Sequence, residues 1–564
     1  MEKNWLVTKT NPEFLNYLSK EASVSSVLAQ VMVNRGFKDA ASIKDFLYPS
    51  LSNLHDPFLL PDMKKAVDRL RTAIDRNETV FVHGDYDADG ITSTALLVSS
   101  LRNLGVNTCY HIPNRIVEGY GLSHKGVQKA KSCGAGLIIT ADCGISSERE
   151  VMNAVSLGMD VIVTDHHEPP EKLPDATAVI DPHRADSEYP FRQLAGVGVA
   201  FKLVQALYQE LRGTGDALQV EDLLDLVALG TVGDSVSLID ENRIFATFGL
   251  KAINDDRCRI GIRAIKEAAG IKGEIRPGSL PYSLIPRINA AGRLDDASEV
   301  VELFLTNEKD VASAMASVLE TQNRKRQKIE GDVFQSALSM INPDEVGNVI
   351  ILSSGDWHPG VIGIVASRLV EMFYRPVFLF SVKDSIAKGS ARSIPPLHLY
   401  EAIAGCSDLL LGFGGHRQAA GLRLSTENMP DFRARMETIV GKALSPEDMI
   451  PVLEIDATVK FSDINFGLIK ELSLLEPHGD SNRAPLFGSK DISVLNHKIV
   501  GNNHLKMQLT QNSVHVDTIG FSMGNEINRI MNASSIDIAY HPGINEWQGM
   551  KNLQLHLKAV RPRS

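Results

Sequence analysis

The sequence predicts an α/β protein of several domains: a parallel-sheet domain, then a long connecting helix, a second α/β domain and a C-terminal β-barrel. Three observations predict this fold. From Thr79 short apolar runs alternate with helical stretches, the segment from Asp310 to Met340 lacks proline, and after Pro451 short alternating runs replace the helical patterns. Because 564 residues exceed the roughly 100–200 residues that one domain usually holds, we expect five segments: 1–75, 76–310, 311–342, 343–446 and 447–564.

Composition and charge exclude several classes of protein. The chain is 43% hydrophobic and 23% charged, as soluble globular proteins are, and its net charge of -11 argues against a uniformly basic surface. The first residues, MEKNWLVTKTNPEF, do not have the pattern of a secretory signal, and no apolar run approaches about 18 residues. We therefore expect a cytoplasmic protein that does not enter a membrane.

The cysteines indicate which metal ligands are available. There are five, scattered and without CxxC spacing, so neither a disulfide framework nor a thiolate zinc site is indicated. They are Cys109, Cys133, Cys143, Cys258 and Cys406. A metal ion would therefore be bound through oxygen and imidazole ligands.

The segment 76–310 is expected to form the parallel sheet. Its apolar runs TVFVHG, VNTCYHI, LIITAD, VIVTDHH and AVIDPH are short enough for buried strands, and TSTALLVSSLRNL between the first two is typical of a helix. Asp87, Asp142 and His166 each follow such a run. In parallel sheets functional residues lie just beyond the carboxyl ends of the strands, so these three side chains are expected to converge.

The remaining segments are assigned by the same patterns. Residues 1–75 are expected to pack on the core, and residues 311–342 to form the connecting helix, because the composition there favours a helix. In 343–446 the runs NVIILSS and PVFLFS alternate with helical stretches, which indicates a second α/β domain. After residue 447, HLKMQLTQ, HVDTIGFSM and NLQLHLKAV indicate a small OB-like β-barrel.

The most informative motif is HGDYDADG at residues 83–90, in which His83, Asp85, Asp87 and Asp89 alternate. The glycines on either side of the aspartates permit a turn that points several of these side chains at one ion. A calcium loop would carry a glutamate at the twelfth position counted from Asp85, but that position is Leu96. We therefore discount calcium.

Three further clusters lie downstream: Asp142 after LIITA, the triplet Asp165-His166-His167 after VIVT, and Asp234 in LVALGTVGDSV. A buried helix-capping aspartate or a core histidine would explain any one of them alone. Together the four clusters supply enough oxygen and imidazole ligands for two divalent ions. Such a pair can generate hydroxide and clamp a phosphodiester, so the sequence predicts metal-dependent phosphodiester hydrolysis.

The segments HGDYDADG, TADCG, VTDHH and TVGDS resemble, in this order, the four motifs of the DHH phosphoesterase superfamily. The resemblance implies two divalent cations, with Mn²⁺ preferred over Mg²⁺. It implies that the first ion is held by His83, Asp87 and Asp142. It implies that the second is held by Asp89, Asp142, His166 and Asp234, with Asp142 bridging.

The same resemblance implies the roles of the catalytic residues, which are His167, Asp142, Asp165 and Asp85. His167 would face the substrate phosphate or the nucleophile, and Asp165 would orient the histidines. Asp85 would share in ligation or stand just outside the ligand shell.

The segment GFGGHRQAAG at residues 412–421 resembles the glycine-rich signature of the DHHA1 domain that accompanies DHH domains. Its glycines allow close backbone approach, and its histidine could meet a phosphate. Other segments carry further candidates, in IPNRIVEGYGL, IPRINAAGRLDDAS, GDWHPG and KGSARS. A structural role would explain any one of these residues alone, but as a set we favour substrate contacts, in which arginines pair with phosphates and a tyrosine stacks on a base. The set is Arg115, Tyr120, Arg287, Asn289, Arg293, His358, Ser390, Arg392, Gly414, Gly415 and His416.

Motif order, length and the terminal β-region are together similar to the bacterial single-strand-specific 5′ exonucleases of this superfamily. This similarity implies hydrolysis of single-stranded DNA from a 5′ end to 5′-mononucleotides, in recombination and repair. It implies a monomer whose partners are single-stranded DNA, a DNA helicase and a single-strand-binding protein.

Two alternatives stay open. A DHH phosphodiesterase of short oligonucleotides or cyclic dinucleotides would use the same ligands, but such enzymes usually lack the extra β-domain. A non-catalytic DHH scaffold of replication would be expected to have lost some ligands, which are intact here. A pyrophosphatase is more distant, because it has no evident use for the domains after residue 342.

Overall fold

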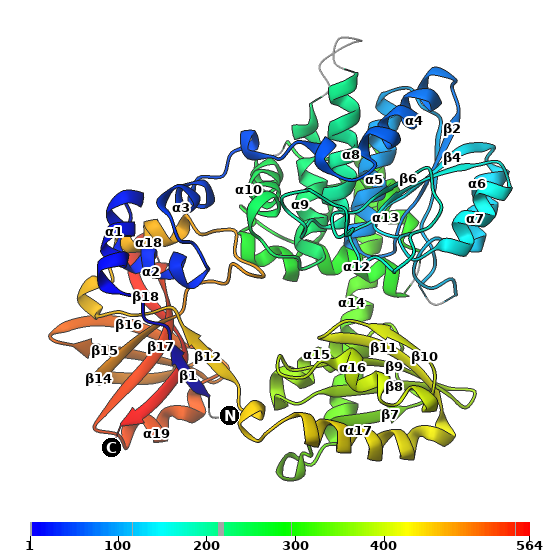
Figure 1. Cartoon of the computed structure of the whole chain (residues 1–564). Helices are drawn as coiled ribbons and strands as arrows, with labels where there is room; N and C mark the ends of the chain where they lie inside the picture. The colour runs from blue at the N-terminus through cyan, green and yellow to red at the C-terminus, as the bar shows by residue number, and fades with distance from the viewer. Residues whose placement is uncertain are drawn as a thin grey trace. The chain divides into compact units, whose positions relative to one another are not determined.

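The computed structural model describes residues 3–115, 117–211, 219–255, 257–294, 296–547 and 549–563 (Figure 1). The chain divides into two compact units. The larger unit contains Trp5–Ile288, Ala297–Ala316 and Glu454–Ser564, and the smaller contains Met1–Asn4, Asn289–Asp296 and Ser317–Leu453. Among the helices in the described ranges, none combines the length and the apolar character that crossing a membrane requires.

A five-stranded parallel sheet in the larger unit confirms the predicted sheet. Its order is β3 (Thr108–His111), β2 (Thr79–His83), β4 (Ala135–Thr140), β5 (Asp160–Thr164) and β6 (Ala178–Ile180). The strands are almost entirely buried, which explains their continuous apolar runs. Because all five run in the same direction, the residues that follow them lie at one edge of the sheet.

Helices cover this sheet. Phe81, Ile138 and Val163 pack in one core with residues of α6 (His124–Ser132) and α7 (Glu148–Ser156). The helix α5 (Ala88–Asn103) follows β2 and contacts α8 (Gly196–Glu210) and α9 (Leu224–Gly233). The other helices of this part are α4 (Met63–Asp75), α10 (Asp240–Asn254), α11 (Ile260–Ala268), α12 (Leu284–Leu294) and α13 (Ser298–Leu305).

The long helix predicted over 311–342 is α14, which runs from Lys309 to Ser339. Its residues as far as Ala316 belong to the larger unit, and those from Ser317 belong to the smaller. In the smaller unit the sheet order is β10 (Leu410–Gly415), β11 (Ala419–Ser425), β9 (Ile386–Arg392), β8 (Val377–Lys383) and β7 (Ile350–Ser354). Only β7 and β8 are parallel, so this second α/β sheet is mixed.

Helices cover both faces of the mixed sheet. Phe378 and Phe380 of β8 join a core with α16 (Leu399–Ala404) and α17 (Met429–Ala443). Val377 and Leu379, which alternate with them, pack with α14 and α15 (Ile362–Phe373). This alternation is the two-residue period that a strand between two layers requires.

The C-terminal region is a closed barrel, as predicted. Its strands are β14 (Phe487–Val500), β15 (His504–Gln511), β16 (Val514–Gly520), β18 (Met550–Arg563) and β17 (Ser535–Trp547), and β14 pairs with both β15 and β17. Register shifts occur in β14 between Ser489 and Ile492 and between Val494 and Asn496. Such irregularities bend a strand, which allows β14 to close the barrel.

The N-terminal segment packs on more than one part of the larger unit. The helices α1 (Pro12–Ala22), α2 (Ser26–Asn34) and α3 (Ala40–Leu47) contribute Leu18, Val31 and Phe46 to the core that contains the barrel residues Phe487 and Leu505. By contrast, α4 contacts α8 and β6. The remaining elements near the barrel are β1 (Asn4–Val7), β12 (Val452–Ile455), β13 (Ala457–Thr458), α18 (Phe466–Ser473) and α19 (Ile527–Met531).

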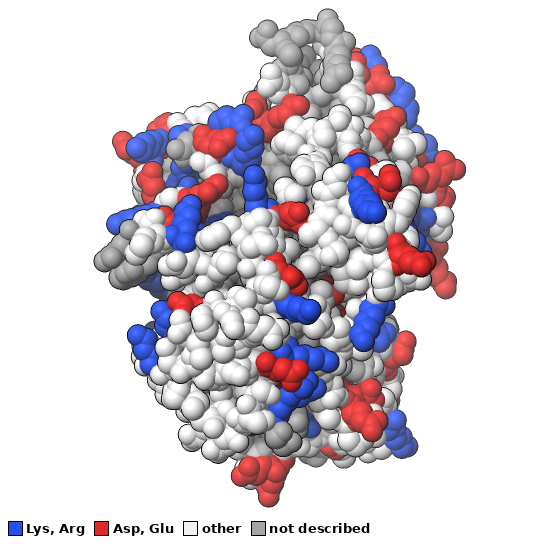
Figure 2. All heavy atoms as spheres, turned by 90° about the vertical axis from the view of Figure 1, so that its left-hand side faces the viewer, with Lys and Arg blue, Asp and Glu red and all other residues white. Residues whose placement is uncertain are grey.

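The net negative charge is not concentrated in one patch on the face shown in Figure 2. Over the described part of that face, acidic and basic side chains are interspersed among uncharged ones. The functionally informative charges are instead those buried at the edge of the parallel sheet.

Candidate metal centre

The turn between β2 and α5 positions the aspartates of HGDYDADG. Asp87 is the N-cap of α5, and its carboxylate accepts hydrogen bonds from the backbone N–H groups of Asp89 (3.0 Å) and Gly90 (3.2 Å). A Cβ at Gly90 would lie 2.6 Å from the backbone of Asp85. Glycine at position 90 therefore allows the turn to close against the helix.

Asp142 follows β4 in a conformation that few aspartates adopt. Its φ is +62°, and its backbone N–H donates to the carbonyl of Thr164 at 3.1 Å. The side chain is buried, and a Cβ at Gly196 would lie 2.4 Å from its Oδ1. Strained backbone held in place by its surroundings is typical of functional sites.

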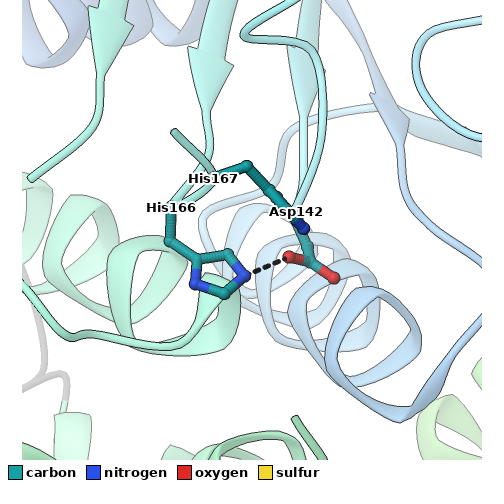
Figure 3. A group of neighbouring side chains, drawn as sticks. All are labelled: Asp142, His166 and His167. Atoms are coloured by element: carbon teal, nitrogen blue, oxygen red, sulfur yellow. Dashed lines mark ion pairs between the residues drawn. The ribbon is translucent and has the colours of Figure 1, made fainter. Parts of the chain in front are cut away.

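Among the described residues, three groups of acidic and histidine side chains have ligand atoms within 4.8 Å of one another. They are Asp142 with His166 and His167, Asp89 with His166 and Asp234, and Asp85 with Asp87 and Asp142. The Nε2 of His166 lies 3.1 Å from Asp142 Oδ1 (Figure 3), 3.6 Å from Asp234 Oδ2 and 3.9 Å from Asp89 Oδ2. Asp142 and His166 thus link the groups into one cluster.

Two helices complete the cluster. The carboxylate of Asp89 accepts hydrogen bonds from the first two backbone N–H groups of α8, at Gly196 (2.7 Å) and Val197 (2.8 Å). Asp234 follows the last residue of α9, a helix in which every residue from 224 to 231 is buried. The strand ends and these helices come together only in the folded chain.

Asp165 holds the two histidines that follow it. Its Oδ1 accepts hydrogen bonds from the backbone N–H groups of His166 (2.8 Å) and His167 (3.2 Å), and it lies 2.7 Å from His167 Nδ1. Its Oδ2 accepts a hydrogen bond from the backbone of Ile145 at 2.8 Å. Both carboxylate oxygens of Asp165 are therefore engaged in hydrogen bonds that fix the backbone of the two histidines and the ring of His167.

Burial and mutual repulsion perturb the carboxylates. Burial and the charge of Asp234 raise the pKa of Asp89 to about 7, and burial and the charge of Asp87 raise the pKa of Asp234 to about 7. Burial, followed by the charge of Asp89, raises the pKa of Asp142 well above its usual value, and burial with the charge of Asp87 does the same for Asp85. Without a counter-cation these groups resist ionisation.

The donor atoms fit a metal ion. Asp142 Oδ1, His166 Nε2 and Asp85 Oδ1 are buried and have no hydrogen-bond partner among the described residues. Buried polar atoms normally have such a partner, so these three atoms are suited to a ligand. Carboxylate and imidazole donors in this number suit Mn²⁺ or Mg²⁺ more than a thiolate-bound metal.

His83 stands apart from these groups. Its Nε2 lies 3.1 Å from the carbonyl of Gly121, and a Cβ at Gly126 would lie 2.4 Å from its Nδ1. Burial lowers its pKa to about 4, so the ring is neutral. In this structure Asp85, which was expected to share or support ligation, joins Asp87 and Asp142, while the expected ligand His83 does not.

Of the expected substrate residues in the larger unit, two lie at the cluster. The guanidinium of Arg115 is 5.1 Å from the centre of the Tyr86 ring. The hydroxyl of Tyr120 lies 3.3 Å from the carbonyl oxygen of Asp142 and 2.9 Å from His167 Nδ1, so it contacts the cluster directly. Arg287 lies on α12 and donates to the carbonyl of Ser283 at 2.6 Å.

Four expected substrate residues gather in the smaller unit, near the start of α15. Arg293 donates to the carbonyl of Gly360 at 3.2 Å, and His358 Nδ1 accepts from the N–H of the same glycine at 3.1 Å. Ser390 and Arg392 of β9 are hydrogen-bonded at 3.2 Å, and a Cβ at Gly363 would lie 2.9 Å from the Ser390 hydroxyl. Donors in this number could bind a phosphate.

The other expected residues of the smaller unit lie elsewhere. Gly414 and Gly415 lie on the edge strand β10, and Gly415 has a φ of +144°, which favours glycine. The backbone N–H of His416 donates to the carbonyl of Ala419 at 2.8 Å, which forms the turn into β11. Asn289 lies half-buried on α12.

Two residues at the same edge of the parallel sheet were not expected. Asp181 directly follows β6 and is fully buried, and burial raises its pKa to about 8. Its Oδ2 and the Nδ1 of His183 have no hydrogen-bond partner among the described residues. The sequence could have indicated Asp181, because in AVIDPH an aspartate directly follows an apolar run, as it does in LIITAD.

Comparison with known proteins agrees with this architecture. Residues 79–231 match the N-terminal domain of the DHH family, 347–442 match the DHHA1 domain, and 455–559 match the RecJ OB domain. The single-stranded-DNA-specific exonuclease RecJ of Bacillus subtilis (strain 168) is 38% identical over 98% of this chain and 70% of its own length. The chain belongs to the RecJ family.

Other RecJ proteins match nearly the whole of this chain. The RecJ of Escherichia coli (strain K12) is 36% identical over 96% of both chains. A crystal structure of RecJ in complex with Mn²⁺ from Thermus thermophilus matches with a TM-score of 0.86 and 30% identity, over 100% of this chain and 80% of that one. A structure of that RecJ with Mg²⁺ has a TM-score of 0.80 and 29% identity. The resemblance that the motifs carried is thus confirmed.

Proposed function

We propose that this chain is a metal-dependent exonuclease that degrades single-stranded DNA from its 5′ end to 5′-mononucleotides, in DNA recombination and repair. The observation that carries the proposal is the buried cluster in which Asp142 Oδ1 and His166 Nε2 lie 3.1 Å apart without hydrogen-bond partners among the described residues. The names of the RecJ relatives support the choice of single-stranded DNA as substrate.

Two divalent cations would be held by this cluster, with Mn²⁺ preferred over Mg²⁺. The proposed ligands are Asp85, Asp87, Asp89, Asp142, His166 and Asp234, with His83 as a further candidate that would have to turn from Gly121. When bound, such cations lower the pKa of water and neutralise charge on a phosphate. Two of the three groups contain Asp142, and His166 links the third group to it, which is consistent with a bridging position for Asp142.

The residues around the ligands supply the remaining chemistry. Burial opposes the charged form of His167, but its hydrogen bond to Asp165 outweighs this and raises the pKa of His167 to about 9. Without metal, the charged form of His167 is therefore favoured at neutral pH. Because Nδ1 is held by Asp165, Nε2 is the nitrogen that would donate a proton to a phosphate oxygen.

The other predicted residues would bind the strand. Arg115, beside the cluster, and Arg293, His358, Ser390 and Arg392, near α15, would contact phosphates, and the OB-like barrel would hold the strand further along. The proposed domain limits are 1–75, 76–310, 311–342, 343–446 and 447–564. Binding to a helicase or a single-strand-binding protein, and a monomeric state, also belong to this proposal, and pull-down and light scattering test them.

One assay tests the activity. Single strands labelled at either end, and a matching duplex, are incubated with the protein and Mn²⁺, and the Asp142→Ala variant is the control. We expect mononucleotides from the 5′ end of the single strand, little loss of duplex and no hydrolysis by the variant. Hydrolysis undiminished in Asp142→Ala would refute the assignment of the site. Equal turnover of dinucleotides and long strands, unaffected by deleting residues 451–564, would indicate a short-oligonucleotide phosphodiesterase.

A further inference from the structure

A buried carboxylate that the proposed chemistry does not use organises the segment after β3. Glu118, whose side chain is 6% exposed, accepts four hydrogen bonds. Its Oε1 accepts from the backbone N–H of Asn114 (3.1 Å) and from Lys125 Nζ (3.2 Å). Its Oε2 accepts from His111 Nε2 (2.9 Å) and from the hydroxyl of Ser123 (2.9 Å).

These four donors come from different places along the chain. His111 is the last residue of β3, Asn114 and Ser123 lie in the connection after it, and Lys125 lies in the first turn of α6. The backbone N–H of Glu118 also donates to the carbonyl of Asn114 at 2.8 Å. One carboxylate therefore ties the beginning of the connection to its end, which fixes the path of the described residues 112–115 and 117–123.

The neighbours of His111 determine which of its ring nitrogens donates to Glu118. Lys129 Nζ lies 2.9 Å from His111 Nδ1 and can only donate, so His111 Nδ1 accepts and its Nε2–H donates to Glu118. Although burial opposes ionisation, hydrogen bonds from His111, Asn114 and the other donors lower the pKa of Glu118 to about 2. Glu118 is thus a carboxylate across the physiological pH range.

The residues held in this way carry the contacts to the metal centre. The hydroxyl of Tyr120 reaches the Asp142 carbonyl and His167, and the carbonyl of Gly121 meets His83. The N–H of Leu122 donates to Ser147 Oγ at 3.2 Å, and Arg115 faces the ring of Tyr86 in the metal-binding turn. A shift of this connection would displace Arg115 and Tyr120 together.

We propose that Glu118 is a positioning residue of the hydrolysis, which acts by holding Arg115 and Tyr120 against the metal centre through its bonds to His111, Asn114, Ser123 and Lys125. This inference rests on the proposed function. Glu118 itself touches neither the predicted ligands nor a substrate group. Its effect on catalysis is therefore exerted through the two residues that it places.

A double-mutant cycle separates positioning from a merely structural role. Glu118→Ala is expected to lower kcat/KM for a single strand by about 100-fold, because displacement of a catalytic group by about 1 Å costs this much. Glu118→Gln, whose amide oxygen still accepts hydrogen bonds, is expected to lower kcat/KM by less. When Arg115→Ala and Tyr120→Phe are already present, the addition of Glu118→Ala should lower kcat/KM by a further factor of less than about three. A further 100-fold loss in that background overturns the proposal.

Two readouts that do not use activity complete the experiment. Hydrogen exchange at the amides of Asn114 and Leu122 should be faster in Glu118→Ala by about tenfold or more, since their bonds define the connection. Mn²⁺ affinity, measured by titration calorimetry, should stay within about threefold of wild type, and loss of Mn²⁺ binding would show a structural role at the centre instead. Glu330→Gln, which removes a carboxylate paired with Arg326 and Arg368, is the matched control and should leave all three measurements unchanged.

The outcomes distinguish this inference from the proposed function. If the wild-type protein does not hydrolyse single strands, the proposed function fails, while faster exchange with unchanged Mn²⁺ affinity still supports the positioning of the connection. If the wild type is active and exchange at Asn114 and Leu122 is unaltered in Glu118→Ala, positioning by Glu118 is refuted. Should Glu118→Ala fail to fold, Glu118→Gln takes its place in the double-mutant cycle and in the hydrogen-exchange measurement. The proposal is then overturned if the effect of Glu118→Gln on kcat/KM is the same with and without Arg115→Ala and Tyr120→Phe, or if exchange at Asn114 and Leu122 is unaltered.

Discussion

Removal of the metal should make the stability of the larger unit fall as the pH rises. The buried carboxylates of the cluster have raised pKa values, Asp89 and Asp234 to about 7 each. In the unfolded chain an aspartate ionises near pH 4. Between pH 4 and pH 7 the unfolded state therefore loses protons that the folded state keeps, and ionisation favours unfolding. The metal-free protein is expected to be most stable on the acid side of this window.

The size of the effect follows from the pKa values. Raising the pKa of one aspartate from 3.8 to about 7 costs roughly 4 kcal/mol of folding free energy above pH 7, at about 1.4 kcal/mol for each tenfold change in proton affinity. A loss of this size is a large part of the roughly 5–15 kcal/mol that stabilises a typical protein. Bound Mn²⁺ opposes it by about 2.7 kcal/mol at a concentration 100 times Kd. Because the cation displaces protons, its stabilisation should be larger at pH 8 than at pH 5.5.

Thermal unfolding with EDTA and with saturating Mn²⁺, at pH 5.5 and pH 8, measures these differences. The Tm of the metal-free protein should be lower at pH 8, and the rise in Tm on adding Mn²⁺ should be greater there. Asp234→Asn serves as control, since without metal its Tm should exceed that of wild type by less at pH 5.5 than at pH 8. A metal-free Tm that is equal or higher at pH 8, or an Asp234→Asn variant that tracks wild type at both pH values, would contradict the reasoning.

Three further predictions concern single residues. Asp165→Asn should lower the hydrolysis rate by about 100-fold while Mn²⁺ affinity changes by less than about tenfold, because it orients His167 without being a predicted ligand; single-turnover kinetics and calorimetry test this. Asp181→Asn should raise Tm at pH 9 and leave it nearly unchanged near pH 4, because burial raises the pKa of Asp181 to about 8. Arg243→Met should destabilise the larger unit by at least about 1–3 kcal/mol, since it leaves without a donor the carbonyls of Phe46, Leu474, Leu475 and Glu476, to which the buried guanidinium donates; unchanged resistance to proteolysis would count against it.

Much of the fold was predictable because its signals are local. Each apolar run of the parallel sheet contains a strand in the structure, and all but the edge strand β3 are mostly buried, since a strand covered on both faces has to be largely apolar. The helix predicted over 311–342 is α14, at Lys309–Ser339, because composition and the absence of proline determine a helix locally. The mixed strand order of the smaller unit was not predictable, because strand pairing is a long-range property.

The candidate site, too, was predictable from the sequence only in part. Asp89, Asp142, His166 and Asp234 could be proposed from motif order, and the structure brings their side chains together. The position of His83, against Gly121 and Gly126, could not be foreseen, because it depends on a connection that arrives from elsewhere in the chain. The same applies to Tyr120, which was expected to stack on a base but contacts Asp142 and His167 in this structure.

The sequence by itself determined the chemistry and the order of the parts. The spacing of aspartates and histidines after buried runs specifies a metal-dependent phosphoesterase, because residue type decides which ligands exist and strand polarity decides at which edge they lie. Only the tertiary structure decided which ligands meet and what holds them. The two N–H groups of α8 that bind Asp89 are 107 and 108 residues away from it in sequence, and only the packing of helices brings them together. The four donors around Glu118 lie within seven residues of it, but only the folded path of the connection between β3 and α6 directs all four at one carboxylate.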